Sequence, residues 1–310
     1  MSEWIHGDEE RVIARVLLRG LVHIARGDIE TAASAVQGAR SDGGLENPES
    51  IRLLRIAIRR IEYQITTMSD VDPTLRVGEL MDRLHHLGEP FGELRDTEII
   101  SERVTKVLGD RRHSVEGKRL VELITEQRDR AQRSSDDALE SGELRFVLDA
   151  LNEFRRRLPS DAITPAMARP VAQQAVRATW SAIKRSAKLA KKSGEDDDLH
   201  KLRRTVKRSV YSTRGFSYVL GPPSEEFAAR LVVLQKALGR QHDRVIVSEW
   251  FRDAGKSDES LASLAGEASR EERRRADSGA DEWAGPWKMV RELRPKDSVM
   301  TTYSFFDERT

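Results

Sequence analysis

The strongest constraint on the fold is a segment that occurs twice, once in each half of the chain. The first copy, residues 54–63, reads LRIAIRRIEY, and the second, residues 202–211, reads LRRTVKRSVY. Aligning them places basic residues on basic residues and ends both copies on a tyrosine. In both copies apolar residues recur at intervals of three or four, which is typical of a helix with one buried side.

A second matching pair lies downstream of the first. FGELRDTEII at 91–100 aligns with LGRQHDRVIV at 238–247, so that Asp96 corresponds to Asp243. From the first arginine of each helical copy to this aspartate there are 41 residues in one half and 40 in the other. Two pairs that keep their order and their separation indicate an internal duplication. We therefore expect two similar helical bundles.

Composition agrees with an all-α protein. Of the 310 residues, 34% are charged and only 5% are aromatic. Ala, Leu, Glu and Arg dominate, whereas runs of strand-forming residues are scarce, and this mixture favours helices. A proline-rich stretch near residue 160 divides the chain into a first half, 1–158, and a second half, 159–295. Residues 296–310 are expected to form a C-terminal tail.

Periodicity and turn residues predict the individual helices. Asn47 is a plausible N-cap for the first duplicated helix, with Pro48 at its first position. The tryptophans Trp283 and Trp287 are expected to pack near the C-terminal end. The other expected helices lie near 8–37, 74–89, 91–108, 113–139, 142–157, 166–192, 224–239, 241–253 and 258–278.

The chain lacks the features of an exported or membrane protein. It has no cysteine, which excludes disulfides and thiolate metal sites and favours a reducing cytoplasm. The N-terminal residues MSEWIHGDEERVIARVLLRG carry acids and arginines where a signal peptide needs an apolar core. No apolar run approaches the roughly 20 residues that span a bilayer. We expect a cytoplasmic protein that does not bind membranes.

The net charge of +1 hides a segregated distribution. Eleven Lys or Arg residues fall between 180 and 214, against four acids in one short run. On the first duplicated helix, Arg52, Arg55 and Arg59 share one face, because positions i, i+3 and i+7 are neighbours on a helix. The second helix repeats this row with His200, Arg203 and Lys207, and Tyr63 and Tyr211 extend the rows by one turn.

Aligned cations repel one another unless an anion or acids lie between them. An extended anion with regular charges would bridge such a row, and the planar fork of arginine suits phosphate oxygens. The helices that precede the duplicated pair add Arg11, Arg15 and Arg19 in one half, and Lys184 and Lys188 in the other. The alternative is that the arginines form structural salt bridges with Asp96, Asp243 and glutamates, and both interpretations can hold at once.

These residues resemble the CHAD domain, the conserved histidine α-helical domain. Its hallmarks are a His-x-x-Arg-x-x-x-[Lys/Arg]-Arg helix in each half and a downstream Leu-Gly-x-x-x-Asp segment. HKLRRTVKR at 200–208 and LQKALGRQHD at 234–243 match closely, and ENPESIRLLRIAIRR at 46–60 with FGELRD matches the other half. The resemblance covers roughly residues 8–290. It implies two four-helix bundles related by an approximate two-fold internal symmetry.

The resemblance also implies a basic surface between the bundles that binds inorganic polyphosphate and directs members to polyphosphate granules. Arg52 replaces the first-half histidine, and the usual additional arginine is Glu62 in one half and Val210 in the other. These departures thin the basic lining. The candidate polyphosphate-binding residues are Arg52, Arg55, Arg59, Arg60, Lys184, Lys188, His200, Arg203, Arg204, Lys207, Arg208 and Tyr211.

Two other functions stay open. His242-Asp243 is typical of metal-dependent phosphohydrolases, which act on polyphosphate or nucleotides but need further ligands. Nucleic acid could also bind the basic surface, although aromatic residues that stack bases are sparse near the motifs.

The adjacent His85 and His86 point about 100° apart on a helix and are expected at the surface. We expect no catalytic residue, metal or cofactor, and a partner that is polyphosphate or another phosphate-rich polyanion.

Overall fold

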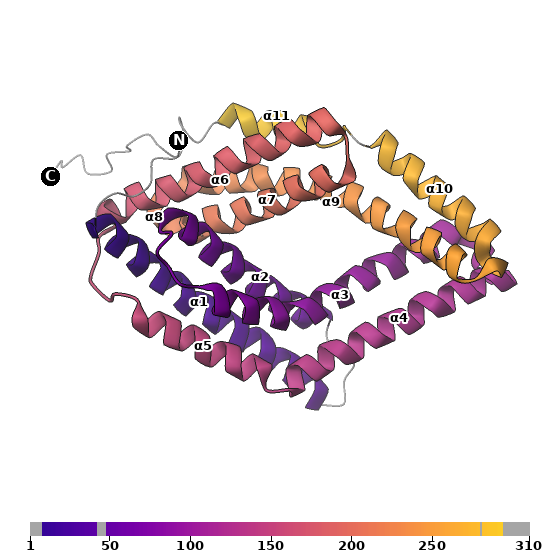
Figure 1. Cartoon of the computed structure of the whole chain (residues 1–310), viewed down its shortest axis with the longest axis horizontal. Helices are drawn as coiled ribbons and strands as arrows, with labels where there is room; N and C mark the ends of the chain where they lie inside the picture. The colour runs from indigo at the N-terminus through magenta and orange to yellow at the C-terminus, as the bar shows by residue number, and fades with distance from the viewer. Residues whose placement is uncertain (1–7, 42–47, 280, 294–310) are drawn as a thin grey trace.

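The computed structural model describes residues 8–41, 48–279 and 281–293. Every regular element within these ranges is a helix, so the all-α prediction is confirmed. No helix within them is both long enough and apolar enough to cross a lipid bilayer. The helices are long and are arranged in an elongated outline, with the long helices α3 and α9 running between its two ends (Figure 1).

The helices of the two halves follow one another in a similar order. The first half contains α1 (Asp8–Ser41), α2 (Pro48–Val71), α3 (Gly78–Leu108), the 3-10 helix η1 (Gly109–His113), α4 (Val115–Glu140) and α5 (Glu143–Arg157). The second half contains α6 (Pro165–Ser193), α7 (Asp196–Gly215), α8 (Ser217–Leu220), α9 (Pro222–Ser257), η2 (Glu259–Leu261), α10 (Ala262–Ser278) and α11 (Ala284–Leu293). The order agrees with a duplication, while the two-fold symmetry and the division into two bundles stay predictions.

The duplicated segments form α2 and α7. The helix α2 begins at Pro48 as expected, because proline fits the first helical position, where an N–H has no intrahelical acceptor. Asn47 lies outside the described residues. Three aspartates occupy the first turn of α7, where negative charge interacts favourably with the helix dipole. The start of each helix is therefore marked by residues in its own first turn.

Two expected helix breaks do not occur. The sequence predicts separate helices at 74–89 and 91–108, but α3 runs through Pro90. Likewise α9 runs through Gly239, where the sequence predicts a break between 239 and 241. Around Pro90, Leu87 and Phe91 are fully buried, and around Gly239, Leu238 and Gln241 are buried. Packing on both sides of each position outweighs the cost of proline or glycine inside a helix.

One large apolar core joins the two halves of the chain. The apolar stripe of α2, including Leu54 and Ile58, is buried in it, as is that of α7, including Leu202 and Val206. Trp283 is also buried in this core, and the ring of Trp287 lies 5.6 Å from that of Trp180. The expected packing of the two C-terminal tryptophans is therefore confirmed.

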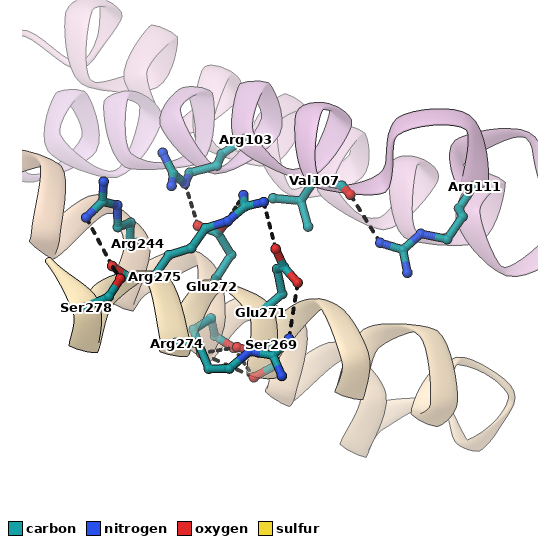
Figure 2. A network of polar contacts seen from close by, with 11 residues as sticks. Arg103, Val107, Arg111, Arg244, Ser269, Glu271, Glu272, Arg274, Arg275 and Ser278 are labelled. Carbon is teal, nitrogen blue, oxygen red and sulfur yellow. Dashed lines mark hydrogen bonds and ion pairs between the residues drawn. The ribbon is translucent and has the colours of Figure 1, made fainter.

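A smaller core lies at the other end of the molecule, where the hairpin of α3 and α4 meets the hairpin of α9 and α10 (Figure 1). Val104 and Leu120 contribute from one hairpin, and Phe251 and Ala265 from the other. Figure 2 shows the polar contacts beside this core, among them the ion pair of Arg103 with the fully buried Glu272. We call this region the distal junction.

Candidate anion-binding site

A cleft of about 960 Å³ lies among α2, α3, α7 and α9. Both duplicated helices contribute to its lining, so the two cationic rows meet in one place. Nine of the twelve candidate residues line this cleft. They are Arg52, Arg55, Arg59, His200, Arg203, Arg204, Lys207, Arg208 and Tyr211.

The helical period places these cations opposite the buried apolar stripes. Ile58 and Ile61 on α2 are fully buried, whereas Arg55 and Arg59 are only partly buried and line the cleft. Each helix thus directs its apolar side into the core and its basic row into the cleft, as the sequence predicts.

Four of the cleft cations have no carboxylate close enough for an ion pair. Within the described part of the chain, no carboxylate lies within 4.0 Å of Arg55, Arg203, Arg204 or Lys207, whereas many other arginines have such a partner. The Nε atoms of Arg55 and Arg203, which occupy equivalent positions in the duplication, are also buried without a hydrogen-bond acceptor. The sequence analysis offered structural salt bridges from these arginines to Asp96 and Asp243 as the alternative. Neither aspartate lies within 4.0 Å of them, so these salt bridges are not formed.

The other cleft arginines have acidic partners. Arg52 donates from Nε to Glu49 at 2.7 Å, and Arg59 donates to Glu62 at 2.9 Å. Arg208 pairs with Asp70 and also donates to the Oγ1 atom of Thr67 at 3.0 Å. The salt-bridge interpretation therefore holds for these three residues and not for the four above.

Burial of charge in the cleft changes the acidity of its basic groups. The pKa of Lys207 is lowered to about 7, first because burial penalises the ammonium and then because Arg203 and Arg55 lie nearby. Burial, followed by repulsion from Arg203, also lowers the pKa of His200. Positive charge is thus unfavourable in this cleft unless an anion enters it.

His200 and His242 lie together in the cleft lining, with ring centroids 4.8 Å apart. His242 comes from α9, and burial lowers its pKa to about 3, so that it is neutral at physiological pH. In the described residues no three His, Asp or Glu side chains are gathered in a way that could hold a metal ion.

Tyr63 and Tyr211, the aligned tyrosines of the duplication, stack on each other in the cleft lining. Their ring centroids are 5.8 Å apart, and the ring planes differ by 13°. Next to them, the hydroxyls of Thr67 and Ser212 are hydrogen-bonded at 2.6 Å. These contacts join α2 directly to α7 where the two halves meet.

Glu62 brings a negative charge into the cleft. Its side chain is 7% exposed, and burial raises its pKa even though Arg59 beside it acts in the opposite direction. Val210, the aligned residue of α7, is buried in the core instead. The two departures from the family pattern are therefore different in kind, since only Glu62 faces the space where an anion would bind.

Three candidate residues do not line the cleft. Arg60 pairs with Asp28 of α1 at 2.8 Å, and Lys184 lies over the ring of Trp180, 5.7 Å from its centroid. Lys188 is exposed on α6. Their participation in binding stays a prediction.

The cationic row expected on α1 does not reach the cleft lining either. Arg15 pairs with the fully buried Asp72 at 2.8 Å, and Arg19 donates to the backbone carbonyls of Arg155 and Leu158. These arginines tie α1 to neighbouring segments. The expectation that the α1 arginines add to the cationic field stays a prediction.

The cleft also contains basic residues that the sequence did not place among the binding candidates, namely Arg95 and His85 from α3 and Lys201 from α7. Lys201 directly follows His200, and Arg95 directly precedes Asp96 in the second repeated segment. Their positions next to residues of the repeated segments were the sequence signal that could have identified them as cleft residues. His85 and His86 are both exposed, as expected, although only His85 borders this cleft.

The fold and the site define a helical protein with a cleft between duplicated helices that is lined by more basic than acidic residues. The model of the CHAD domain family matches residues 23–252. Because this match covers most of the chain, the protein belongs to the CHAD domain family. Membership agrees with the polyphosphate-associated function that the resemblance implies.

Solved structures of other proteins share this fold. The crystal structure of the CHAD domain from the plant Ricinus communis has a TM-score of 0.72 at 18% identity, covering 90% of this chain and 92% of that one. PptA from Streptomyces chartreusis has a TM-score of 0.67 at 17% identity, covering 88% of this chain and 98% of that one. No curated protein sequence matches the chain.

Proposed function

We propose that the cleft binds inorganic polyphosphate without cleaving it. The observation that supports this most is the group of Arg55, Arg203, Arg204 and Lys207, which line one cleft with no carboxylate within 4.0 Å of them among the described residues. Arg55, Arg203 and Lys207 are partly buried and Arg204 is exposed, and a folded protein seldom leaves several partly buried cations without counter-charges close by. A ligand that supplies the missing negative charge would stabilise this arrangement.

Polyphosphate fits this requirement better than a small anion. Its charges repeat along a flexible chain, so that one molecule could contact the cations of both α2 and α7. Each contact forms charge-assisted hydrogen bonds and releases counterions, which makes binding strongly dependent on salt. We further propose that this binding associates the protein with polyphosphate granules in the cytoplasm.

Nucleic acid is a weaker candidate for the same cleft. Proteins that hold single strands without sequence preference usually offer aromatic faces on which bases stack. Here the two tyrosines of the cleft stack on each other, so each ring has one face already covered. The cleft thus favours polyphosphate, which consists of charged phosphate units alone, over nucleic acid, which also carries bases.

The proposal is tested by titrating the protein with long-chain polyphosphate across a salt series. Replacing Arg55 and Arg203 together with alanine is expected to weaken binding roughly 100-fold, since each charged contact contributes about 1.5–3 kcal/mol and part is screened. The control replaces Arg119 and Arg157 with alanine, which removes two exposed positive charges on α4 and α5, outside the cleft lining. Absence of binding at moderate salt, or equal losses in both double variants, contradicts the proposal.

Cleavage is tested separately. Phosphate release from polyphosphate is measured with and without a divalent metal, for the unmodified protein and for His242→Ala. We expect no release above background in any sample. Metal-dependent release that disappears in His242→Ala would show instead that the protein is a phosphohydrolase.

A further inference from the structure

The helix α6 contains no acidic residue, although it is 29 residues long. Every other helix of ten or more residues in the described part of the chain contains at least one Asp or Glu. Five of the seven basic residues of α6 fall at 184–193, at its C-terminal end. A helix face that only meets solvent typically alternates charges of both signs. The C-terminal part of α6 instead presents positive charge alone.

The stability of the helix accounts for only part of this charge. Lys191 and Lys192 occupy the last turn, where cations interact favourably with the helix dipole. Arg185 and Lys188 precede that turn, and both are exposed. Among the described residues no carboxylate lies within 4.0 Å of either side chain, whereas the exposed Arg157 of α5 has an acidic partner. Arg185 and Lys188 therefore have no counter-charge close by in the fold.

A direct contact places this part of α6 beside the cleft. The Oγ atom of Ser186 and the Oγ1 atom of Thr205 are 3.3 Å apart, so α6 and α7 lie side by side at this level (Figure 1). Thr205 lines the cleft, and so does Arg204, the residue before it, which is exposed. Arg185 directly precedes Ser186 and shares a face of α6 with Lys188, because residues three apart are neighbours on a helix. Basic residues thus continue from the cleft lining across α7 onto α6.

We propose that the exposed face of α6 that carries Arg185 and Lys188 binds the part of a long polyphosphate chain that extends out of the cleft. The inference rests on the proposed function of the cleft. From the cleft the chain would pass Arg204 at the edge of α7 and reach α6, whose axis lies about 8–10 Å away, as is usual for packed helices. A short anion that fits inside the cleft would not contact α6.

The arrangement favours long chains over short ones. A contact between an exposed cation and a phosphate is weak by itself, but a chain already held in the cleft presents its next phosphates to α6 at a high effective concentration. Acidic residues limit this surface at the turn between α6 and α7. There Asp198 pairs with Lys201 at 3.1 Å, and Asp196 pairs with Arg273. The chain is therefore expected to cross α6 before its last turn.

The test compares tripolyphosphate with long-chain polyphosphate by titration of the full chain. In the double variant Arg185→Gln with Lys188→Gln, the affinity for long chains should fall roughly 10- to 30-fold at about 0.1 M salt, because each phosphate contact on a single-stranded polyanion contributes about 0.7 to the logarithmic salt slope. The slope itself should decrease by about 1.4. Tripolyphosphate should bind the variant and the unmodified protein equally, to within about twofold, since exposed charges outside the cleft are screened.

The matched control is Arg130→Gln with Arg133→Gln. Both arginines are exposed on α4, which contributes no residue to the cleft lining, and the control loses the same charge. Its affinity for long chains should stay within about twofold of that of the unmodified protein.

Equal losses of long-chain affinity in the two double variants overturn the inference, as does an equal loss for tripolyphosphate in the α6 variant. Strong long-chain binding that does not depend on Arg185 and Lys188 contradicts this inference alone. An unmodified protein that binds neither long nor short chains contradicts the proposed function of the cleft instead.

Discussion

The rings of Tyr63 and Tyr211 stack at a centroid distance of 5.8 Å, although 148 residues separate them in the chain. They occupy the same position in the two duplicated helices, so α2 and α7 contact each other through equivalent side chains. This contact brings the cationic row of each helix to the same cleft. The duplication therefore produces one shared site instead of two separate ones.

We predict that the tyrosine stack stabilises the contact between α2 and α7. Tyr63→Leu and Tyr211→Leu should each lower the free energy of unfolding by about 1–2 kcal/mol, and the double variant by less than the sum, because the pair shares about 0.5–1.5 kcal/mol of coupling. Denaturant unfolding of the four proteins measures this coupling. Tyr63→Phe keeps the stacked ring and serves as the control. Fully additive losses would show that the stack contributes nothing beyond burial.

Polyphosphate binding should weaken as the pH rises through 7. Burial lowers the pKa of Lys207 to about 7 in the free protein, and a bound anion must raise it again. Binding is thus accompanied by proton uptake above this pH, and the affinity should fall roughly tenfold between pH 6 and pH 8. His200, whose pKa is lowered by burial, adds to the same trend at lower pH.

Calorimetric titration at a series of pH values checks this dependence, with long chains whose terminal phosphates contribute little. Lys207→Arg keeps its charge at every pH and should flatten the fall between pH 7 and pH 8. If the affinity of Lys207→Arg falls equally steeply between pH 7 and pH 8, groups other than Lys207 cause the pH dependence.

Removing the negative charge of Glu62 should tighten polyphosphate binding. Glu62 lines the cleft and pairs with Arg59 at 2.9 Å. Glu62→Gln at pH 8 should raise the affinity roughly fivefold at low salt, because a carboxylate near the bound phosphates repels them at a cost of about 1 kcal/mol. Asp28→Asn is the matched control, since Asp28 pairs with Arg60 outside the cleft lining. An unchanged or weaker affinity in Glu62→Gln argues against an anion bound beside Arg59.

The distal junction should depend on the buried Glu272 (Figure 2). Its carboxylate accepts from Arg103 at 2.6 Å and from Arg275 at 3.0 Å, and it is fully buried. Glu272→Gln should lower the free energy of unfolding by about 2–4 kcal/mol, because the arginines lose their buried counter-charge. Chemical denaturation measures this loss. Glu271→Gln, which removes a partly exposed partner of Arg275, should cost less than about 1 kcal/mol.

Much of the local structure follows from the sequence because its causes are local. Pro48 marks the start of α2, and Leu54 and Ile58 recur at the spacing that buries one side of a helix. The prediction of a helix break at Pro90 was wrong because the cause of the continuous helix is not local. Burial of Phe91 and its neighbours against distant segments decides that α3 continues, and no local pattern contains that information.

The sequence by itself determined the all-helical fold, the duplication and the motifs that mark the CHAD family. It also determined the two cationic rows, one containing Arg55 and the other Arg203. The tertiary structure alone decided which cations share the cleft. Arg59 and Arg60 are adjacent, yet Arg59 lines the cleft and Arg60 pairs with Asp28 of α1. Helical spacing sets the angles between side chains on one helix, whereas the rotation of that helix against its neighbours is set by packing between residues far apart in the sequence.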